Sequence, residues 1–309
     1  MPSSGLSRED FAGAPLIAIV GPTASGKSAW AAELAEAAGS EIVGADSRQV
    51  YRGLDIGTAK PAAAERARIP HHCVDQIDPR ERYHVARYLR EAGEAIAGIQ
   101  ARGRRPLLVG GTGQYVWALL EGWDVPEVAP DDAFRGEMQA RAEREGAEAL
   151  HTELAQTDPV AAAAIPAANV RRVIRALEVQ RASGRPISAW HAARAPLPVR
   201  IVAPEVEREE LGARIDSRVE EMFAAGLVGE TQALLEAGVP PDAPGFDSVG
   251  YREVVRYLAG ELPLEACVAA VKRSTRRLAK KQRAWFRRDD ARIQWCGDVA
   301  AARAVLLDG

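Results

Sequence analysis

Short apolar runs alternate with longer amphipathic segments along residues 15–122. The runs have the length and the β-branched side chains of buried strands, and the longer segments repeat alanine and leucine at helical spacing. Alternation of this kind is typical of a parallel sheet with helical crossovers, which is an α/β fold. We predict strands at 16–20, 41–46, 72–77 and 106–109, with helices at 29–38, 85–102 and 114–121 between or after them.

The pattern changes near residue 123. No run up to residue 197 suits a strand, and turns rich in proline and glycine close the segment. We predict an all-helical insertion domain at 123–198 with helices at 131–155, 159–165 and 169–182. It interrupts a core domain made of 15–122 and 199–309, and residues 1–14 form a flexible tail.

The strand and helix pattern resumes after the insertion. The glycine-rich stretch 53–61 in the first half is too long for a simple connector, and such loops are usually functional. In the second half we predict strands at 200–204 and 293–296, and helices at 207–225, from about 247–253 onward, and at 264–288.

Composition places the chain among ordinary globular proteins, with 47% hydrophobic and 27% charged residues. The apolar runs are too short to span a membrane, and the first residues lack the apolar centre of a signal peptide. Three cysteines, Cys73, Cys267 and Cys296, lie far apart, which favours a reducing compartment over a disulfide framework or a zinc site. We therefore expect a cytoplasmic protein without a membrane partner.

Positive charge is concentrated near the C-terminus. Ten basic and two acidic residues lie between Lys272 and Arg292, a local charge of +8 in a chain of net charge −3. Such a cluster favours a polyanion such as nucleic acid, with Trp285 and Phe286 available for base stacking. The alternatives are a solvated helix with acidic neighbours, and aromatic side chains that belong to the core.

Residues 21–28 read G-x-x-x-x-G-K-S between a strand and a helix, the pattern of a phosphate-binding loop. Gly21 and Gly26 allow the sharp turn that brings backbone N–H groups to phosphate oxygens, and the following helix directs its positive end at the same anion. Lys27 supplies a charge for the terminal phosphate and Ser28 a hydroxyl for Mg²⁺. The alternative is a chance match in a turn that binds nothing.

Other polar residues follow strand ends or share helix faces. Asp46 ends one predicted strand and Thr112 follows another, so both would lie at the edge where the phosphate loop ends. Asp46 alternatively only caps a turn, and the glycines before Thr112 only permit one. Paired arginines suit a diphosphate or RNA phosphates, or make ordinary helical ion pairs. They are Arg214 and Arg218 in one helix, and Arg171, Arg172 and Arg175 in the insertion.

Five blocks in series carry a family resemblance. They read GPTASGKS (21–28), DSRQVYRGLDIGTAKP (46–61), GGTGQY (110–115), VGYRE (249–253) and TRRLAKKQRAWF (275–286). In this order and spacing the chain resembles the bacterial tRNA dimethylallyltransferases, also called isopentenyl-pyrophosphate:tRNA transferases. The C-terminal zinc finger of some eukaryotic members has no counterpart here.

The resemblance implies a P-loop NTPase-like sheet and transfer of a dimethylallyl group to tRNA. The group would pass from dimethylallyl diphosphate to N6 of the adenosine immediately 3′ of the anticodon. Asp46 would be the general base, Thr112 would lie beside the reacting base, and Lys27 would stabilise the departing diphosphate. The donor would be held by Gly21, Pro22, Thr23, Ala24, Ser25, Gly26, Lys27 and Ser28, with Mg²⁺ at Ser28, and by Arg214 and Arg218.

The same resemblance implies contacts with the anticodon stem-loop of tRNA by a monomeric protein. The target base must leave its stack to react, so a pocket must receive it. Asp46, Ser47, Arg48, Gln49 and Thr112 would line that pocket, and Arg171, Arg172, Arg175, Lys280, Lys281 and Arg283 would contact the RNA.

Three other functions remain open from sequence. An adenylate isopentenyltransferase would use the same donor on a free nucleotide, but would not need the insertion or the basic tail. A phosphate-loop kinase would bind ATP and transfer its γ-phosphate. A non-catalytic RNA-binding protein would not need Lys27, Ser28 and Asp46 together.

Overall fold

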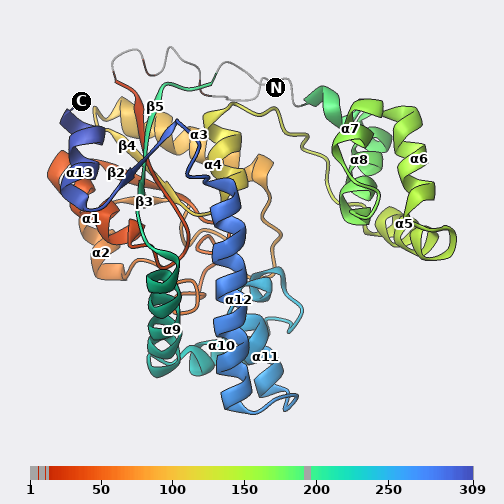
Figure 1. Ribbon diagram of the computed structural model, residues 1–309. Coiled ribbons are helices and arrows are strands. Elements are labelled where there is room, and N and C mark those ends of the chain that lie inside the picture. Colours follow the sequence, from red (N-terminus) through yellow and green to blue (C-terminus); the bar gives the residue numbers. More distant parts are fainter. Residues whose placement is uncertain (1–5, 7–10, 12–13, 191–195, 309) are drawn as a thin grey trace. The chain divides into compact units, whose positions relative to one another are not determined.

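The computed structural model describes residues 6, 11, 14–190 and 196–308, so most of the predicted tail lies outside the described residues. The chain divides into two compact units (Figure 1). One unit combines Met1–Leu120 with Leu197–Gly309, and the other is Glu121–Pro196.

The first unit is built on a six-stranded parallel sheet with the order β3-β2-β4-β1-β5-β6. Its central strands are buried along their whole length, which explains why they read as continuous apolar runs instead of alternating ones. The strands are β1 (Leu16–Val20), β2 (Glu41–Ala45), β3 (His71–His72), β4 (Pro106–Gly110), β5 (Val199–Pro204) and β6 (Ile293–Cys296).

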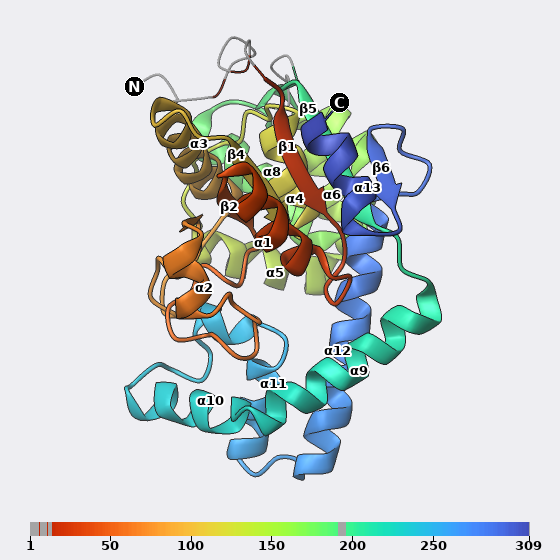
Figure 2. The same cartoon turned by 90° about the vertical axis from the view of Figure 1, so that its left-hand side faces the viewer.

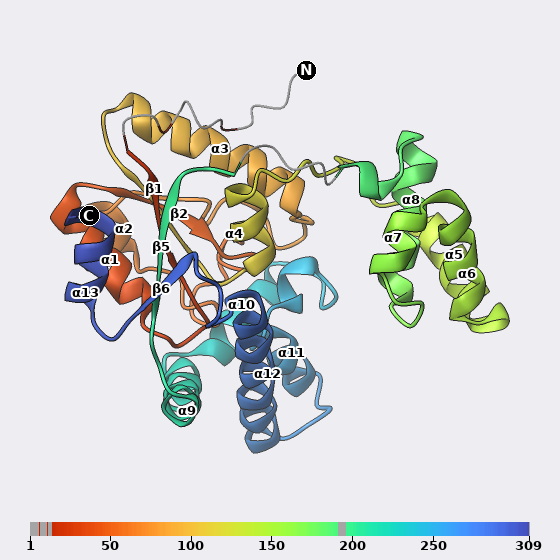
Figure 3. The same cartoon turned by 45° about the horizontal axis from the view of Figure 1, so that its top comes forward.

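Helices cover both faces of this sheet (Figures 2 and 3). On one face, Leu34 of α1 and Leu306 near the C-terminus join Ile19, Ile42 and Leu107 of the strands in one buried cluster. On the other face α3 and α4 pack against β2 and β4. These helices are α1 (Lys27–Ala38), α3 (Val85–Ala101), α4 (Gly113–Leu120) and α13 (Val299–Arg303), followed by a last turn at Ala304–Asp308, and the short α2 (Ala63–Arg68) precedes β3.

A group of helices lies beyond the carboxyl ends of the strands (Figure 1). They surround the loop that follows β2, and Tyr51, Leu54, Phe246, Tyr251 and Val271 belong to their shared core. The helices are α9 (Arg208–Ala224), α10 (Leu227–Glu236), α11 (Tyr251–Leu258) and α12 (Leu264–Trp285), with a short 3-10 helix at Pro244–Asp247.

Buried polar contacts fix the glycine-rich loop 53–61. The Lys60 ammonium donates to Asp55 at 2.5 Å and to Asp75 at 2.7 Å. Glu230 accepts from the Ile56 N–H at 3.0 Å, and the Gly57 N–H donates to the Tyr251 hydroxyl at 3.0 Å. Because Glu230 and Tyr251 come from distant parts of the chain, the loop has one defined shape against the helices.

The second unit contains helices and, in its described residues, no strand. Phe134, Leu150, Leu154 and Val173 belong to its core. The helices are α5 (Asp132–Glu145), α6 (Ala147–Thr157), α7 (Pro159–Ala164) and α8 (Val170–Ser183), with a 3-10 turn at Ile187–Trp190.

Glu178 is a buried carboxylate within this unit. It accepts from Arg135 at 2.8 Å, from Arg175 at 2.7 Å and from the Asp131 N–H at 2.8 Å. Burial alone would raise the pKa of Glu178, but these hydrogen bonds hold the pKa below its usual value. The carboxylate therefore joins α5 and α8 as an anion.

Two predicted elements are wrong in their extent. The strand expected at 72–77 ends at His72, because Cys73 (φ +58°) and Asp75 (φ +59°) adopt left-handed backbone that turns the chain away. The single helix expected at 131–155 is two helices, since Gly146 has φ +88° and separates α5 from α6. In the described part of the chain, no helix is long and apolar enough to cross a membrane.

Replacing Glu178 by Gln should lower the free energy of unfolding by about 2 kcal/mol, because two arginines lose a charged acceptor. Denaturant titration measures this, and Glu145→Gln, which alters an exposed ion pair, should leave the free energy of unfolding nearly unchanged. The Glu178 contribution is complete above pH 4.5 and is lost as the pH falls through the lower folded pKa. Equal losses in both variants would contradict this role of Glu178.

Candidate active site at the phosphate loop

The phosphate loop joins the end of β1 to the start of α1. Gly21 (φ +145°), Ala24 (φ +63°) and Gly26 (φ +94°) have backbone angles that let the loop fold back on itself. Gly26 is the N-cap residue of α1 and makes no side-chain capping hydrogen bond. No capping side chain therefore competes with a ligand for the N–H groups at the positive end of the helix. The buried Ser25 hydroxyl has no hydrogen-bond partner among the described residues. Loop and helix together have the chemistry of an anion site.

Two cations and one carboxylate lie beside this loop. Burial lowers the pKa of Lys27 to about 8, Asp46 opposes that shift, and Arg218 adds to it. Burial also lowers the pKa of Arg218, again against the attraction of Asp46. Two desolvated cations that share one carboxylate form a region that a bound polyanion would stabilise.

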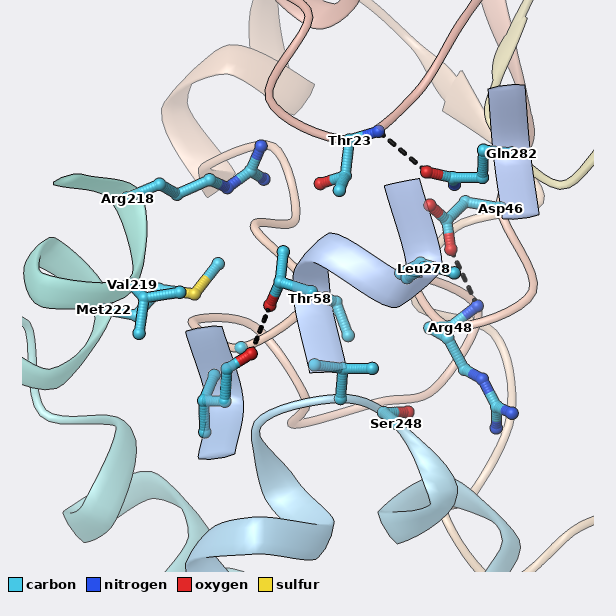
Figure 4. Close-up of a pocket in the computed structure, with 14 residues that line it drawn as sticks. Thr23, Asp46, Arg48, Thr58, Arg218, Val219, Met222, Ser248, Leu278 and Gln282 are labelled. Atoms are coloured by element: carbon cyan, nitrogen blue, oxygen red, sulfur yellow. Dashed lines mark hydrogen bonds between the residues drawn. The ribbon is translucent and has the colours of Figure 1, made fainter. Parts of the chain in front are cut away.

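Arg214 reaches the phosphate loop from α9. Its guanidinium donates to the Ser25 carbonyl at 3.4 Å and to Glu210 at 2.6 Å. Arg214 therefore forms a helical ion pair and also contacts the loop. Arg218, one helical turn later, points into the site itself (Figure 4).

Asp46 follows β2 and both caps a turn and faces a pocket. Its Oδ1 accepts from the Arg48 N–H at 2.9 Å and the Gln49 N–H at 3.4 Å. Oδ2 accepts no hydrogen bond from the described residues. Thr112, after β4, accepts from the Ser47 N–H at 3.1 Å, and its own N–H donates to the Ala45 carbonyl at 3.1 Å. The structure thus joins the two strand ends that the sequence indicated.

Arg48 and Gln49 also hold neighbouring segments. The Arg48 guanidinium donates to the Pro244 carbonyl at 3.2 Å. The Gln49 side-chain amide donates to the carbonyls of Thr58 and Ala59 at 3.0 and 3.1 Å. Gln49 therefore fixes the loop 53–61 relative to Asp46, and its N–H₂ group is committed to that contact.

A pocket opens between these groups (Figure 4). Figure 4 shows Arg218 on one side of Thr23 and Asp46 on the other. Polar and apolar side chains both line the pocket. The polar lining includes Thr23, Asp46, Arg48, Arg218 and Gln282, and the apolar lining is Val219, Met222, Val249, Val271 and Leu278.

Sequence reasoning missed much of this lining. Val271, Thr275, Leu278 and Gln282 come from α12, where the sequence analysis named the charges, the aromatic residues and a block of family resemblance but gave none of these four residues a role. Their spacing of four, three and four residues places them on one face of the helix. That spacing was the available signal, but it does not say which surface the face packs against.

The basic cluster divides into paired and unpaired residues. Five of its members form ion pairs with acidic side chains: Lys272, Arg276, Arg287, Arg288 and Arg292. The other five form no ion pair with any residue that the structure describes: Arg273, Arg277, Lys280, Lys281 and Arg283. Acidic neighbours account for half of the cluster, and the rest is free for a polyanion.

The arginines of the helical unit divide similarly. Arg175 pairs with the buried Glu178 and donates to the Val128 carbonyl, so much of its charge is used in the fold. Arg171 and Arg172 lie exposed at the start of α8. They stay candidates for RNA contact, whereas Arg175 has a structural partner.

Few protein groups near the phosphate loop could act as ligands of a metal ion. No group of three or more His, Cys, Asp or Glu side chains in the described ranges could hold one. Ser28 lies exposed in the first turn of α1, next to Lys27. Mg²⁺ commonly takes one or two protein ligands and completes its shell with phosphate oxygens and water, so this donor set fits a magnesium ion that arrives with a diphosphate.

Sequence comparisons extend these observations. The family model described as IPP transferase matches residues 49–289, and the model described as isopentenyl transferase matches residues 14–74. A relative from Thermomicrobium roseum named tRNA dimethylallyltransferase is 50% identical over 283 residues, 91% of this chain and 85% of its own length. A protein of the same name from Geobacter sulfurreducens is 48% identical over 284 residues, 91% of both chains.

Solved structures agree with the sequence matches. The tRNA isopentenylpyrophosphate transferase from Bacillus halodurans matches with a TM-score of 0.67 and 40% identity, over 91% of this chain and 89% of that one. A eukaryotic dimethylallyltransferase acting on tRNA matches with a TM-score of 0.76 and 26% identity, over 95% of this chain and 76% of that one.

The sheet and its loop define an α/β protein of the P-loop NTPase-like class, as predicted. The matches to sequences and structures narrow this class. The chain belongs to the tRNA dimethylallyltransferase family, whose members are prenyltransferases, and the predicted family is confirmed.

Diphosphate binding should weaken as the pH rises through about 8, the pKa of Lys27 in the free protein. An anion binds the charged ammonium and raises its pKa, so affinity is highest below that pH and falls by up to about tenfold per pH unit above it. Titration of inorganic diphosphate at several pH values measures this. Lys27→Arg should flatten the profile because guanidinium stays charged, and identical profiles in both proteins would contradict the assignment.

Proposed function

We propose that this protein transfers a dimethylallyl group from dimethylallyl diphosphate to N6 of the adenosine 3′-adjacent to the anticodon in tRNA. The observation that carries the proposal is a single pocket beside the phosphate loop that is lined by a cation, a carboxylate and several apolar side chains. A prenyl diphosphate likewise combines an anionic head with an apolar tail. Family membership supports the same reaction.

The cationic end acts on the leaving group. Negative charge grows on the diphosphate as its bond to the allylic carbon breaks, so fixed positive charge lowers the barrier. Lys27, Arg218 and Arg214 supply that charge, and the backbone N–H groups at the start of α1 supply donors. Mg²⁺, held by Ser28 and diphosphate oxygens, would add Lewis-acid stabilisation when bound. Thr23 belongs to the loop and lines the pocket, so its hydroxyl can donate to the diphosphate.

Asp46 acts on the attacking amine. An exocyclic adenine amine is a weak nucleophile and must lose a proton on alkylation. Backbone N–H groups hold Asp46 Oδ1, Oδ2 accepts no hydrogen bond from the described residues, and Asp46 lines the pocket, so the carboxylate is oriented and can accept that proton. Thr112 and Ser47, bonded to each other beside it, border the space for the base.

The tail of the donor would lie against the apolar part of the pocket lining. Val219, Met222, Val249, Val271 and Leu278 offer an apolar surface next to Arg218. Burying a five-carbon group there removes apolar area from water and keeps water from the reacting carbon.

RNA binding rests on the charges that the fold leaves unpaired. Lys280, Lys281 and Arg283 in α12 contact phosphates of the anticodon stem-loop, and Arg171 and Arg172 in the helical unit do the same. Arg48 and Gln49 line the entrance for the flipped base. A mononucleotide substrate would leave these cations without a role, which favours tRNA over free AMP.

Replacing Asp46 by Asn should lower the turnover number by about 10²- to 10⁴-fold, because it removes the base and keeps the hydrogen bonds to Arg48 and Gln49. Turnover of labelled dimethylallyl diphosphate with a stem-loop RNA measures this. RNA affinity should stay near the wild-type value, and Asp289→Asn on the exposed surface should react normally. A matching loss of RNA affinity would make Asp46 a structural residue only.

Replacing Lys280, Lys281 and Arg283 together by Gln should weaken RNA binding. The slope of log affinity against log salt concentration should become shallower, by about two to three released counterions. Binding of the stem-loop across a series of salt concentrations gives the slope. The matched control removes Lys272, Arg276 and Arg287, which are already paired, and should change the slope less. Equal slopes for the two triple variants would place the RNA elsewhere.

A further inference from the structure

Helix α12 has two faces with different tasks. Leu278 and Gln282 are one turn apart and face the pocket beside the phosphate loop. Lys280 and Lys281 lie within the same turn and are exposed. The unpaired cations and the pocket lining therefore belong to one rigid element, separated only by the width of a helix.

Gln282 joins that helix to the phosphate loop directly. Its Oε1 accepts a hydrogen bond from the Thr23 N–H at 2.8 Å, across 259 residues of sequence (Figure 4). The side chain is 7% exposed. A Cβ added at Gly111 would overlap its amide nitrogen, so the Gln282 amide is held between the phosphate loop and the turn after β4.

The end of α12 is fixed to the core one turn later. The Trp285 side chain packs over Gly113, where any Cβ would overlap it. The Trp117 indole N–H donates to the Trp285 carbonyl at 3.1 Å. Gln282 and Trp285 therefore connect α12 to the core within one turn. A shift of the outer face of α12 would also move Gln282 and change its hydrogen bond with the Thr23 N–H.

We propose that Gln282 is a positioning residue that couples RNA binding on the outer face of α12 to the shape of the diphosphate site. This deepens the proposed function and rests on it. RNA phosphates that bind Lys280 and Lys281 hold α12 in one position, and the Gln282–Thr23 hydrogen bond holds the phosphate loop in its binding shape. By linkage, diphosphate in the loop strengthens RNA binding by the same factor.

Calorimetric titration of inorganic diphosphate tests the coupling, with full-length protein that is either free or saturated with a stem-loop RNA in the same Mg²⁺ buffer. The coupling factor is the ratio of the two affinities. We expect the wild-type factor within the common range of about 5- to 150-fold. Gln282→Met keeps the length of the side chain and removes the acceptor, so its factor should fall to about one.

Two further variants control the result. Gln282→Glu keeps an acceptor for the Thr23 N–H, so it should keep the coupling factor although its charge lowers diphosphate affinity. Gln232→Met makes the same exchange at an exposed residue of α10, whose amide bonds to Glu236 of its own helix, and should leave both affinities unchanged. If the Met variant fails to fold, the coupling factor of the Glu variant still tests the proposal.

The outcomes separate the two proposals. A wild-type factor of one, a Met variant with the wild-type factor, or a Glu variant that loses coupling as fully as Met would overturn the role of Gln282 while the proposed function stands. A wild-type protein that binds neither diphosphate nor the stem-loop would contradict the proposed function, and the coupling with it.

Discussion

Two desolvated cations, Lys27 and Arg218, share the carboxylate of Asp46 at the carboxyl edge of the sheet, and the site depends on this arrangement. Burying cations close together is unfavourable: burial is the main cause that lowers the pKa of both groups, and repulsion from Arg218 adds to it at Lys27. The fold maintains it because the cations come from rigid elements, α1 and α9, and the carboxylate from the end of β2. An anion with several charges relieves the repulsion, so the site is built for a ligand that brings negative charge.

The arrangement of the strands explains why these groups meet. β2, β4 and β1 are parallel neighbours, so the polar residues that follow them reach the same edge. Gly110 has no room for a side chain because the Ala45 carbonyl occupies the position of its Cβ. That close approach lets Thr112 bond to Ser47 and completes the wall beside Asp46. The small residues at the strand ends are thus needed to bring the polar residues of the site together.

Local sequence predicts the part of the site that is built locally. The phosphate loop, the strand ending at Asp46 and the turn at Thr112 are contiguous motifs whose geometry follows from glycine and strand direction. The contact of Gln282 with Thr23 and the apolar wall at Met222 depend on how distant helices pack, and no spacing in one sequence fixes that. The same limit applies to the basic cluster, since the acidic partners of Lys272 and Arg276 lie in α9. The strand predicted beyond His72 is wrong because Cys73 and Asp75 adopt left-handed backbone angles within an apolar run.

The central claim is that the phosphate loop holds a leaving diphosphate and not a nucleoside triphosphate. It is tested most directly with donor labelled both in its carbon chain and in its phosphorus, incubated with unmodified anticodon stem-loop RNA. We expect carbon label in the RNA at the target adenosine and an equal amount of phosphorus label in free diphosphate. Donor that stays intact while ATP transfers its γ-phosphate to a substrate would contradict the claim.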